Sequence, residues 1–268
     1  MKPDVVYNAS IGKFGMGDLH CPGTPPPPKG YPLVMTIHGG GWSSMTRDSF
    51  AGVASWLADN GWAAFNIDYR LAPENRFPAA LDDCLAAAQF LLQGGLTEPL
   101  LDCSRLSVLG ASAGGHLALM CGLSLPPEKV AALVSISGIC DVFPDFALFP
   151  ERYEMLWGHL PDTRELMQMN PAAIFRHGAP PMLCTHFYRD SVVPVQSCLN
   201  FVQAVAEKGG DVSTYLYDLG RDQQGHAIWI PESSPHRLLP DLEAIILAFL
   251  KLHNTECQKD RQPQKRKF

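Results

Sequence analysis

The sequence lacks long apolar runs and any excess of positive charge. Its longest apolar stretch near the C-terminus runs from Ala244 to Leu250, far short of the ~20 residues that span a membrane. The first residues, Met1 to Asp4, lead into no apolar segment of the kind found in a signal peptide. Lysine and arginine number 21 against 27 acidic residues, a net charge of −6, which disfavours nucleic acid and anionic membranes as partners. We therefore expect a cytoplasmic protein; a secreted protein whose signal peptide has been removed is the alternative that remains open.

The eight cysteines lack the spacing of a zinc site, because no two of them lie two to four residues apart. Several stand in apolar segments such as 81–92 and 117–123, where a reduced cysteine behaves as a small hydrophobic residue. We expect mostly free, buried thiols in a reducing compartment, and one or two disulfides are the alternative. The sequence indicates neither a metal ion nor an organic cofactor.

The composition is that of a folded domain, with 46% hydrophobic and 18% charged residues, so disorder of the whole chain is excluded. After a proline-rich connection at 21–30, short apolar runs alternate with longer segments of helical periodicity. This alternation is typical of a mostly parallel sheet with helices on both faces, so we predict a single α/β domain over 1–268. The expected strands span 33–38, 63–69, 106–109, 130–137, 182–186 and 213–219, and the expected helices span 50–60, 79–93, 114–123, 195–208 and 238–253.

One segment interrupts the alternation of strands and helices. Residues 141–175 contain many aromatic side chains among prolines and acids, including Phe143, Phe146 and Trp157. Because such a segment is too aromatic for a solvated loop, we expect it to form a small lid insertion over one edge of the sheet. The tail at 255–268 is rich in lysine and arginine, and we expect it to be disordered.

A serine stands in the pattern Gly-x-Ser-x-Gly between an expected strand and an expected helix, where the segment from Gly110 to Gly115 reads GASAGG. Such a sharp turn lifts the serine out of the sheet and places its hydroxyl at a helix N-terminus. We predict that Ser112 is a nucleophile. The alternative is a glycine turn with a purely structural role.

A glycine-rich segment, HGGGW from His38 to Trp42, follows the first buried strand. Attack of a serine on an acyl group forms an oxyanion, which needs preorganised N–H donors. Glycines let the backbone approach a substrate closely and direct such donors toward it. Together with Ser112 farther along the chain, the segment predicts an oxyanion hole.

A serine nucleophile needs a base and an orienting acid, which follow it here in the order Ser…Asp/Glu…His. Asp190 and His226 each come directly after an expected strand, at the edge where open α/β sheets place their chemistry. We therefore predict Asp190 as the acid and His226 as the base. The rivals are His186, which ends its strand too early, Asp218, which lies inside the strand before His226, and Asp222, which is too local to His226.

Five motifs in order carry a resemblance to a known family. They are HGGGW, DYRLAPE from Asp68 to Glu74, FPAALDD from Phe77 to Asp83, GASAGGHLAL from Gly110 to Leu119, and RDSVVPVQS from Arg189 to Ser197. Over roughly 33–254 the chain resembles the α/β-hydrolases of the hormone-sensitive-lipase-like esterase group. The resemblance is greatest to the compact branch that contains acetyl-xylan and feruloyl esterases.

The resemblance implies roles for particular residues. It implies a catalytic triad of Ser112, Asp190 and His226, and an oxyanion hole formed by the N–H groups of Gly40, Gly41 and Ala113. It further implies that Asp68, Arg70, Glu74 and Asp83 fix loops through ion pairs. His116, on the helix after the nucleophile, is expected to pack or hydrogen bond in the interior.

We predict a carboxylesterase that cleaves short-chain acyl esters of small molecules through an acyl-enzyme, with acetylated or feruloylated carbohydrates as candidate substrates. The candidate substrate-contacting residues are all aromatic: Trp42, Phe143, Phe146 and Trp157. An amidase of the arylformamidase type would use the same residues and is the alternative activity. A non-catalytic receptor on the same fold is the other alternative, although such receptors typically lose the histidine.

Overall fold

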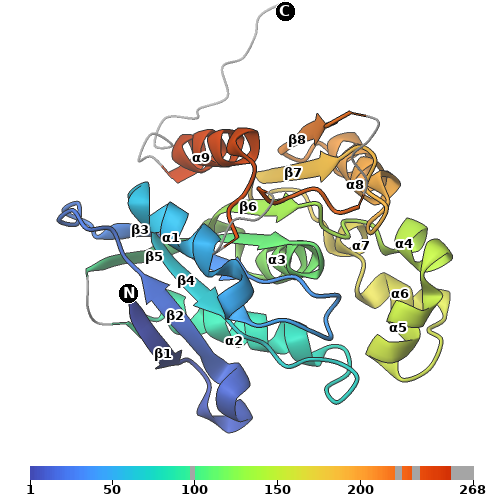
Figure 1. Cartoon of the computed structure of the whole chain (residues 1–268), viewed down its shortest axis with the longest axis horizontal. Coiled ribbons are helices and arrows are strands. Elements are labelled where there is room, and N and C mark those ends of the chain that lie inside the picture. The colour runs from blue at the N-terminus through green and yellow to red at the C-terminus, as the bar shows by residue number, and fades with distance from the viewer. Residues whose placement is uncertain (97–99, 221–224, 231–235, 255–268) are drawn as a thin grey trace, which may run out of the picture.

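An eight-stranded sheet runs through the part of the chain that the structure describes (Figure 1). The structure is a computed structural model and describes residues 1–96, 100–220, 225–230 and 236–254. The strand order is β1-β2-β4-β3-β5-β6-β7-β8, and every neighbouring pair from β4 to β8 is parallel. The strands are β1 (Lys2–Val6), β2 (Met16–His20), β3 (Tyr31–Ile37), β4 (Ala63–Ile67), β5 (Leu101–Ala111), β6 (Val130–Ile136), β7 (Met182–Phe187) and β8 (Val212–Tyr217).

Helices cover both faces of the sheet. On one face lie α1 (Ala51–Asp59) and α9 (Pro240–Asn254), and on the other lie α2 (Ala79–Leu92), α3 (Ala113–Ser124) and α8 (Val195–Glu207). Each face has its own hydrophobic cluster, which includes Leu57 and Phe249 on the first face and Leu117 and Phe201 on the second. Burial on both faces explains why the central strands are apolar without interruption. The predicted parallel sheet with helices on both sides is confirmed.

The sequence prediction missed the antiparallel hairpin of β1 and β2, which extends the sheet beyond β4. These strands are short and carry polar residues such as Lys2, Asp4 and Asp18, so they lack the apolar run that marks a buried strand. The strand expected at 106–109 is also longer, because β5 begins at Leu101 and pairs with Tyr31 before a register shift. The other predicted strands and helices are present with small shifts at their ends.

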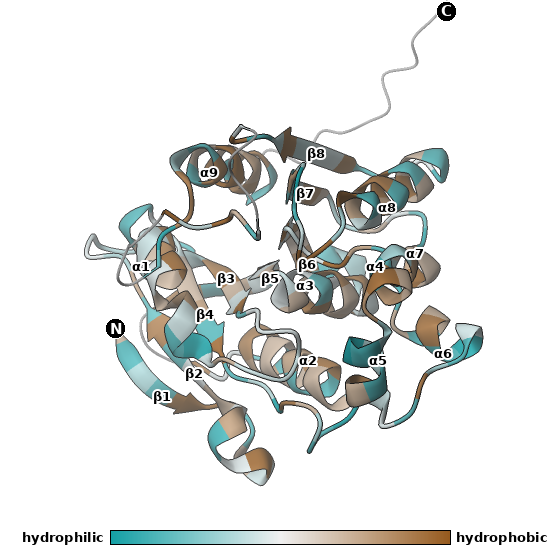
Figure 2. Cartoon of the chain, turned by 45° about the vertical axis from the view of Figure 1, so that its right-hand side comes forward, coloured by the Kyte–Doolittle hydropathy of each residue, from teal (hydrophilic) through white to brown (hydrophobic). Residues whose placement is uncertain are grey.

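The insertion at 141–175 forms four short helices, of which α4 packs on α8 and α7 packs on α3 and α8, while α5 lies beside α4 and α6 beside α7 (Figure 2). They are α4 (Val142–Leu148), α5 (Pro150–Trp157), α6 (Thr163–Gln168) and α7 (Pro171–Ile174). Local sequence defines where they begin: Asp141 and Asp162 accept hydrogen bonds from the first turns of α4 and α6, and α5 and α7 begin with a proline. The predicted disordered tail falls at 255–268, outside the described residues.

No helix in the described ranges is both long enough and apolar enough to cross a membrane. The seven cysteines of the described part of the chain, all except Cys257, are free thiols. Within the same ranges, no three histidine, cysteine or acidic side chains are grouped as metal ligands.

Candidate active site

Ser112 lies on a strained turn between β5 and α3, with a φ of 57°. This left-handed conformation is rare for residues other than glycine and occurs where the surrounding structure enforces it. The neighbouring glycines make the turn feasible, because a Cβ on Gly110 would lie 2.1 Å from the carbonyl oxygen of Gly114. A Cβ on Gly114 would lie 2.2 Å from the carbonyl oxygen of Ile37. The turn therefore has the geometry that the Gly-x-Ser-x-Gly pattern predicts.

The glycine segment after β3 lies directly beside this turn. A Cβ on Gly39 would approach the Cβ of Ser112 to 3.2 Å, and Gly40 and Gly41 have φ values of 100° and 58°. The hydroxyl of Tyr69 donates to the carbonyl oxygens of His38 and Gly39, at 3.1 and 3.0 Å. These contacts fix the backbone of the glycine segment beside the nucleophile turn.

Asp190 and His226 are hydrogen bonded to each other, with 2.6 Å between the Oδ2 and Nδ1 atoms. The other carboxylate oxygen of Asp190 accepts the backbone N–H groups of Val192 and Val193, both at 2.9 Å, and its side chain is fully buried. With Nδ1 donating to the carboxylate, a neutral imidazole carries its lone pair on Nε2. That Nε2 atom is buried and has no hydrogen-bond partner in the described residues. The pair is thus oriented as a base awaiting a proton donor.

One cavity of about 320 Å³ unites these groups. Ser112, His226, Gly40 and Gly41 all line it, whereas Ala113, at the start of α3, is fully buried and does not. Its other described walls are mostly apolar and include Met45, Phe50, Val192, Ile228, Trp229 and His236. No Lys, Arg, Asp or Glu side chain of the described residues lines it. The described wall next to the serine is therefore largely apolar.

The rivals considered for acid and base have other roles or lie elsewhere. His186 lies under Asp190, with 3.9 Å between its Nε2 atom and Oδ2 of Asp190, and Nε2 donates to the carbonyl oxygen of Val193 at 3.0 Å. Asp218 forms an exposed ion pair with Arg189 at 2.9 Å. Asp222 lies outside the described residues.

His116 packs in the interior, as predicted. Its Nε2 atom donates to the carbonyl oxygen of Met169 at 2.7 Å, and its Nδ1 atom accepts the indole N–H of Trp42 at 3.3 Å. Complete burial lowers the pKa of His116 to about 4, an effect that the hydrogen bond to Met169 partly opposes. The ring is therefore neutral near pH 7.

The predicted substrate contacts of four aromatic residues need correction. Trp42 has a φ of 61°, which turns its side chain inward onto His116 and Tyr153, and only 1% of its surface is exposed. Phe146 packs its ring against Tyr153 at 5.3 Å, and Trp157 packs against Phe77 at 5.0 Å. Neither these residues nor Phe143 line the cavity, because the insertion packs on α3 and α8 instead.

The cavity wall that sequence reasoning missed comes from two segments. Met45 and Phe50 follow HGGGW, and Trp229 and His236 follow His226. Phe50 contacts Trp229 edge-to-face at 5.8 Å, and Trp229 lies against His236 at 5.6 Å. The only signal in the sequence is the proximity of these residues to the two motifs.

The loop-fixing ion pairs implied by the family motifs are present in part. Arg70 contacts both carboxylate oxygens of Asp83, with the closest N–O distance at 2.8 Å. Asp68 pairs instead with Arg47, a residue outside the motifs, and also accepts its backbone N–H at 2.8 Å. The pKa of both guanidinium groups is raised. For Arg70 the main cause is its hydrogen bonds to Asp83. For Arg47 burial lowers the pKa, but the neighbouring carboxylates of Asp68 and Asp18 raise it by more.

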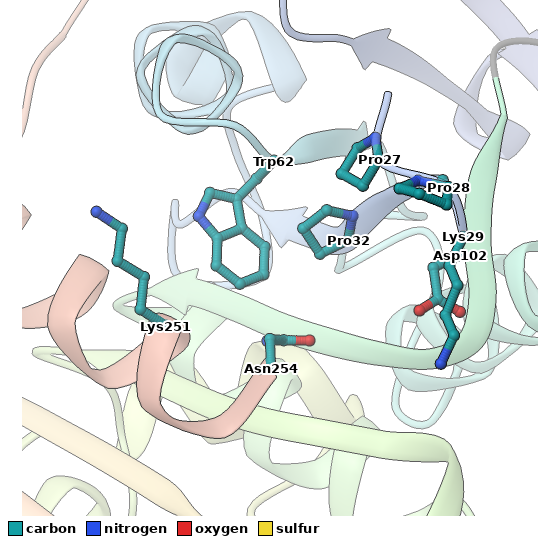
Figure 3. Close-up of a pocket in the computed structure, with 9 residues that line it drawn as sticks. Pro27, Pro28, Lys29, Pro32, Trp62, Asp102, Lys251 and Asn254 are labelled. Atoms are coloured by element: carbon teal, nitrogen blue, oxygen red, sulfur yellow. The ribbon is translucent and has the colours of Figure 1, made fainter. Parts of the chain in front are cut away.

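A second and larger cavity, of about 650 Å³, lies at the amino ends of the central strands (Figure 3). Pro27, Pro28, Pro32 and Trp62 supply its rings, and Lys29, Asp102 and Lys251 supply its charges. Among its described lining residues there is no serine, histidine or cysteine that could act as a nucleophile or base. We therefore assign the chemistry to the smaller cavity.

The parallel sheet, the elbow turn at Ser112 and the edge that bears Asp190 and His226 define the class as an α/β-hydrolase. The BD-FAE family matches residues 18–205, so the chain belongs to this family. The predicted resemblance to hormone-sensitive-lipase-like esterases is thereby confirmed.

Curated relatives carry esterase names. Esterase LipC of Mycobacterium tuberculosis is 29% identical over 253 residues, which cover 87% of this chain and 61% of LipC. Versiconal hemiacetal acetate esterase stcI of Emericella nidulans is 37% identical over 129 residues, which cover 46% of this chain and 42% of that protein. The chain thus spans less than two thirds of the length of both relatives.

Solved structures show the same fold at low sequence identity. Esterase B from Lactobacillus rhamnosis has a TM-score of 0.77 and 19% identity, with 94% of this chain and 86% of that chain covered. A bifunctional GH43-CE protein of Bacteroides eggerthii has a TM-score of 0.80 and 21% identity, with 94% of this chain and 38% of that chain covered. These similarities confirm the predicted α/β-hydrolase fold.

Proposed function

We propose that the protein is a carboxylesterase that uses Ser112, His226 and Asp190 as its catalytic triad. The observation that carries this proposal is the 2.6 Å hydrogen bond between Asp190 and His226, whose Nε2 atom has no hydrogen-bond partner among the described residues, in a cavity that Ser112 also lines. The esterase names of LipC and stcI support the same reaction class.

In the proposed mechanism, Ser112 Oγ attacks the ester carbonyl while His226 Nε2 takes its proton. The N–H groups of Gly40, Gly41 and Ala113 stabilise the oxyanion, and loss of one such donor typically costs on the order of 2.7–4 kcal/mol. His226 then protonates the leaving alcohol and later activates the water that hydrolyses the acyl-enzyme. Asp190 keeps the imidazole in the required tautomer and stabilises the imidazolium.

The acyl group is proposed to be short and uncharged. The cavity next to Ser112 has a volume of about 320 Å³ and an apolar wall that includes Met45, Phe50 and Trp229. Each buried methylene adds only about 0.8 kcal/mol of favourable transfer energy, whereas a chain that meets the wall loses its alignment for attack. The fold shared with a carbohydrate esterase from gut microbiota, at 18% identity and a TM-score of 0.78, is consistent with sugar esters as candidate substrates.

The proposed domain organisation is one catalytic unit over 1–268, with 141–175 as an insertion that flanks α3 and α8. Phe146 and Trp157 of the insertion pack against the rings of Tyr153 and Phe77 and do not cover the cavity. A cytoplasmic location stays a prediction from the sequence.

A chain-length series of 4-nitrophenyl esters tests the proposed function. We expect kcat/KM to be highest from acetyl to butyryl and to fall steeply by octanoyl, with no jump in rate on emulsions. An organophosphate should add its mass to the peptide that contains Ser112 in the wild type and not in Ser112→Ala. A maximum at decanoyl or longer would contradict the short acyl site, and labelling of the alanine variant would contradict the nucleophile. Faster turnover of matched formyl amides than of esters would show an amidase instead.

A further inference from the structure

The insertion contacts the loop of the proposed acid through the guanidinium group of Arg152. This residue lies on α5, and its Nη1 atom donates to the carbonyl oxygen of Val192 at 2.9 Å. Val192 stands between β7 and α8, two residues after Asp190, and it also lines the catalytic cavity. A charged side chain of the insertion thus reaches a segment on which the proposed triad depends.

The carbonyl group that Arg152 binds belongs to the same peptide unit as an N–H group that binds Asp190. Val192 supplies the carbonyl of this unit and Val193 supplies its N–H, which donates to Oδ1 of Asp190 at 2.9 Å. Because a peptide unit is planar and stiff, the guanidinium and the carboxylate are hydrogen bonded to the two ends of one rigid plate. A hydrogen bond to the carbonyl oxygen also polarises the unit and strengthens its N–H as a donor. A shift of Arg152 is therefore passed directly to Asp190.

The guanidinium group is itself held by neighbours within the insertion. Its Nη1 atom also donates to Oδ1 of Asp145 at 3.1 Å, and its Cζ atom lies 3.8 Å from the centre of the Phe149 ring. The side chain of Asp145 is fully buried, and its Oδ2 atom accepts the hydroxyl of Tyr153 at 3.0 Å. Burial raises the pKa of Asp145 to about 6, although Arg152 and Tyr153 oppose this effect. Above that pH the carboxylate is charged and pairs with Arg152.

Hydrogen bonds at the start of α4 fix the insertion to the body of the fold. The backbone N–H of Asp141 donates to Oγ of Ser197 at 3.0 Å, and Ser197 lies on α8. The buried carboxylate of Asp141 accepts the side-chain amides of Asn170 and Asn200, at 3.0 and 2.9 Å. Arg152 therefore extends toward the acid loop from a support that is anchored to α8.

We propose that Arg152 is a positioning residue, which holds the peptide unit after Val192 so that Asp190 stays aligned with His226. The inference rests on the proposed esterase function and its triad. It gives the insertion a part in catalysis without contact between its side chains and the substrate. A guanidinium suits this role, because hydrogen bonds from a charged donor are roughly twice as strong as those from a neutral one. The alternative is that Arg152 only stabilises the insertion through its ion pair with Asp145.

The test measures kcat and KM for 4-nitrophenyl acetate together with the unfolding midpoint. Arg152→Met keeps the apolar stem over Phe149 but removes both hydrogen bonds. It should lower kcat by roughly 10-fold through misalignment of Asp190, with KM within about twofold of the wild type. Arg152→Lys retains a cation that can donate to Val192 and should lose no more than about threefold in kcat. Asp145→Asn leaves the bond to Val192 in place, so it should lower the unfolding midpoint while kcat falls by no more than about threefold.

Two further variants complete the comparison. Arg189→Met is the matched control, since it removes a guanidinium next to the acid from an exposed ion pair with Asp218, and it should leave kcat and KM within about twofold of the wild type. The double variant Arg152→Met/Asp145→Asn removes both charges of the buried pair and should show the kcat of Arg152→Met with a higher unfolding midpoint. A kcat that follows the unfolding midpoint across these variants, or a wild-type kcat in Arg152→Met, would overturn the positioning role alone. Hydrolysis of the ester by Ser112→Ala at the wild-type rate would overturn the proposed function instead.

Discussion

The two edges of the parallel sheet bear cavities of very different character. The cavity at the amino edge has twice the volume, about 650 against 320 Å³, and is walled by prolines and an indole ring. The cavity at the carboxyl edge contains a hydroxyl, an imidazole and a glycine segment. Its backbone is also strained, with positive φ values at Ser112 and at Met45, 57° and 71°. The comparison teaches that volume alone does not mark a reactive site.

The difference follows from the way parallel strands direct the chain. Strands β3 and β5 both end at the carboxyl edge, so the segments that follow them meet there, and the acid after β7 joins them. At the amino edge, the chain enters the strands through connections such as 21–30, whose prolines shape a surface without supplying donors. Substitutions at the carboxyl edge should therefore lower kcat, whereas substitutions at the amino edge should change only the stability of the fold.

The largest expected effect comes from the acid at the carboxyl edge. Asp190→Asn should lower kcat by roughly 10⁴-fold, because an amide favours the wrong imidazole tautomer. Circular dichroism and the unfolding midpoint should stay near those of the wild type, since the amide oxygen can still accept the N–H groups of Val192 and Val193. Asp218→Asn is the control, because its carboxylate is exposed and pairs with Arg189. If Asp218→Asn proved the more damaging change in kcat, Asp190 would not be the acid.

A smaller effect is expected from the histidine beneath that acid. His186 Nε2 donates to the carbonyl oxygen of Val193, whose N–H in turn donates to Asp190, so His186 acts as a positioning residue. His186→Gln should lower kcat by roughly 10- to 100-fold through misplacement of the acid, with KM nearly unchanged.

His20 provides the matched control at the other edge. It is a buried histidine near the amino end of β4, where its partner in the sheet is Ala64. His20→Gln should change the unfolding midpoint without a selective loss of kcat. Equal kinetic effects of the two substitutions would mean that His186 has only a structural role.

The smallest expected effect concerns the pH dependence of stability. It tests whether His116, on the helix after Ser112, has a packing role. Burial lowers the pKa of His116 to about 4, whereas an unfolded chain binds that proton near pH 6.5. The unfolded state therefore binds more protons as the pH falls, and the contribution of His116 to stability should be lost between about pH 6.5 and 4. Urea midpoints at pH 7 and pH 4.5 should fall less in His116→Gln than in the wild type. A larger fall in the variant would contradict a neutral, buried His116.

The order of motifs along the chain predicts that the residues of the proposed triad share one edge of the sheet, but it does not predict the walls of the cavity. Ser112, Asp190 and His226 could be placed from the strands that precede them, because strand ends converge by topology. Phe50 and Trp229 could not, because their contact at 5.8 Å joins segments far apart in the sequence. The substrate role expected for Trp42 was wrong for a local reason: a positive φ turns the indole toward His116, and hydropathy carries no information about φ. The β1–β2 hairpin escaped prediction because it is held by pairing with β4 and not by an apolar run.

Ser112 follows a buried central strand and His226 follows an exposed strand, and this difference has a consequence for heat inactivation. Ser112 follows β5, whose last residues are fully buried in the middle of the sheet. His226 follows β8, the last strand in the described order, where most residues are partly or fully exposed. Segments with few buried contacts open at lower free energy than the core. On warming, His226 should therefore leave the cavity that Ser112 lines while the sheet is still intact, so catalysis should be lost reversibly before the protein melts.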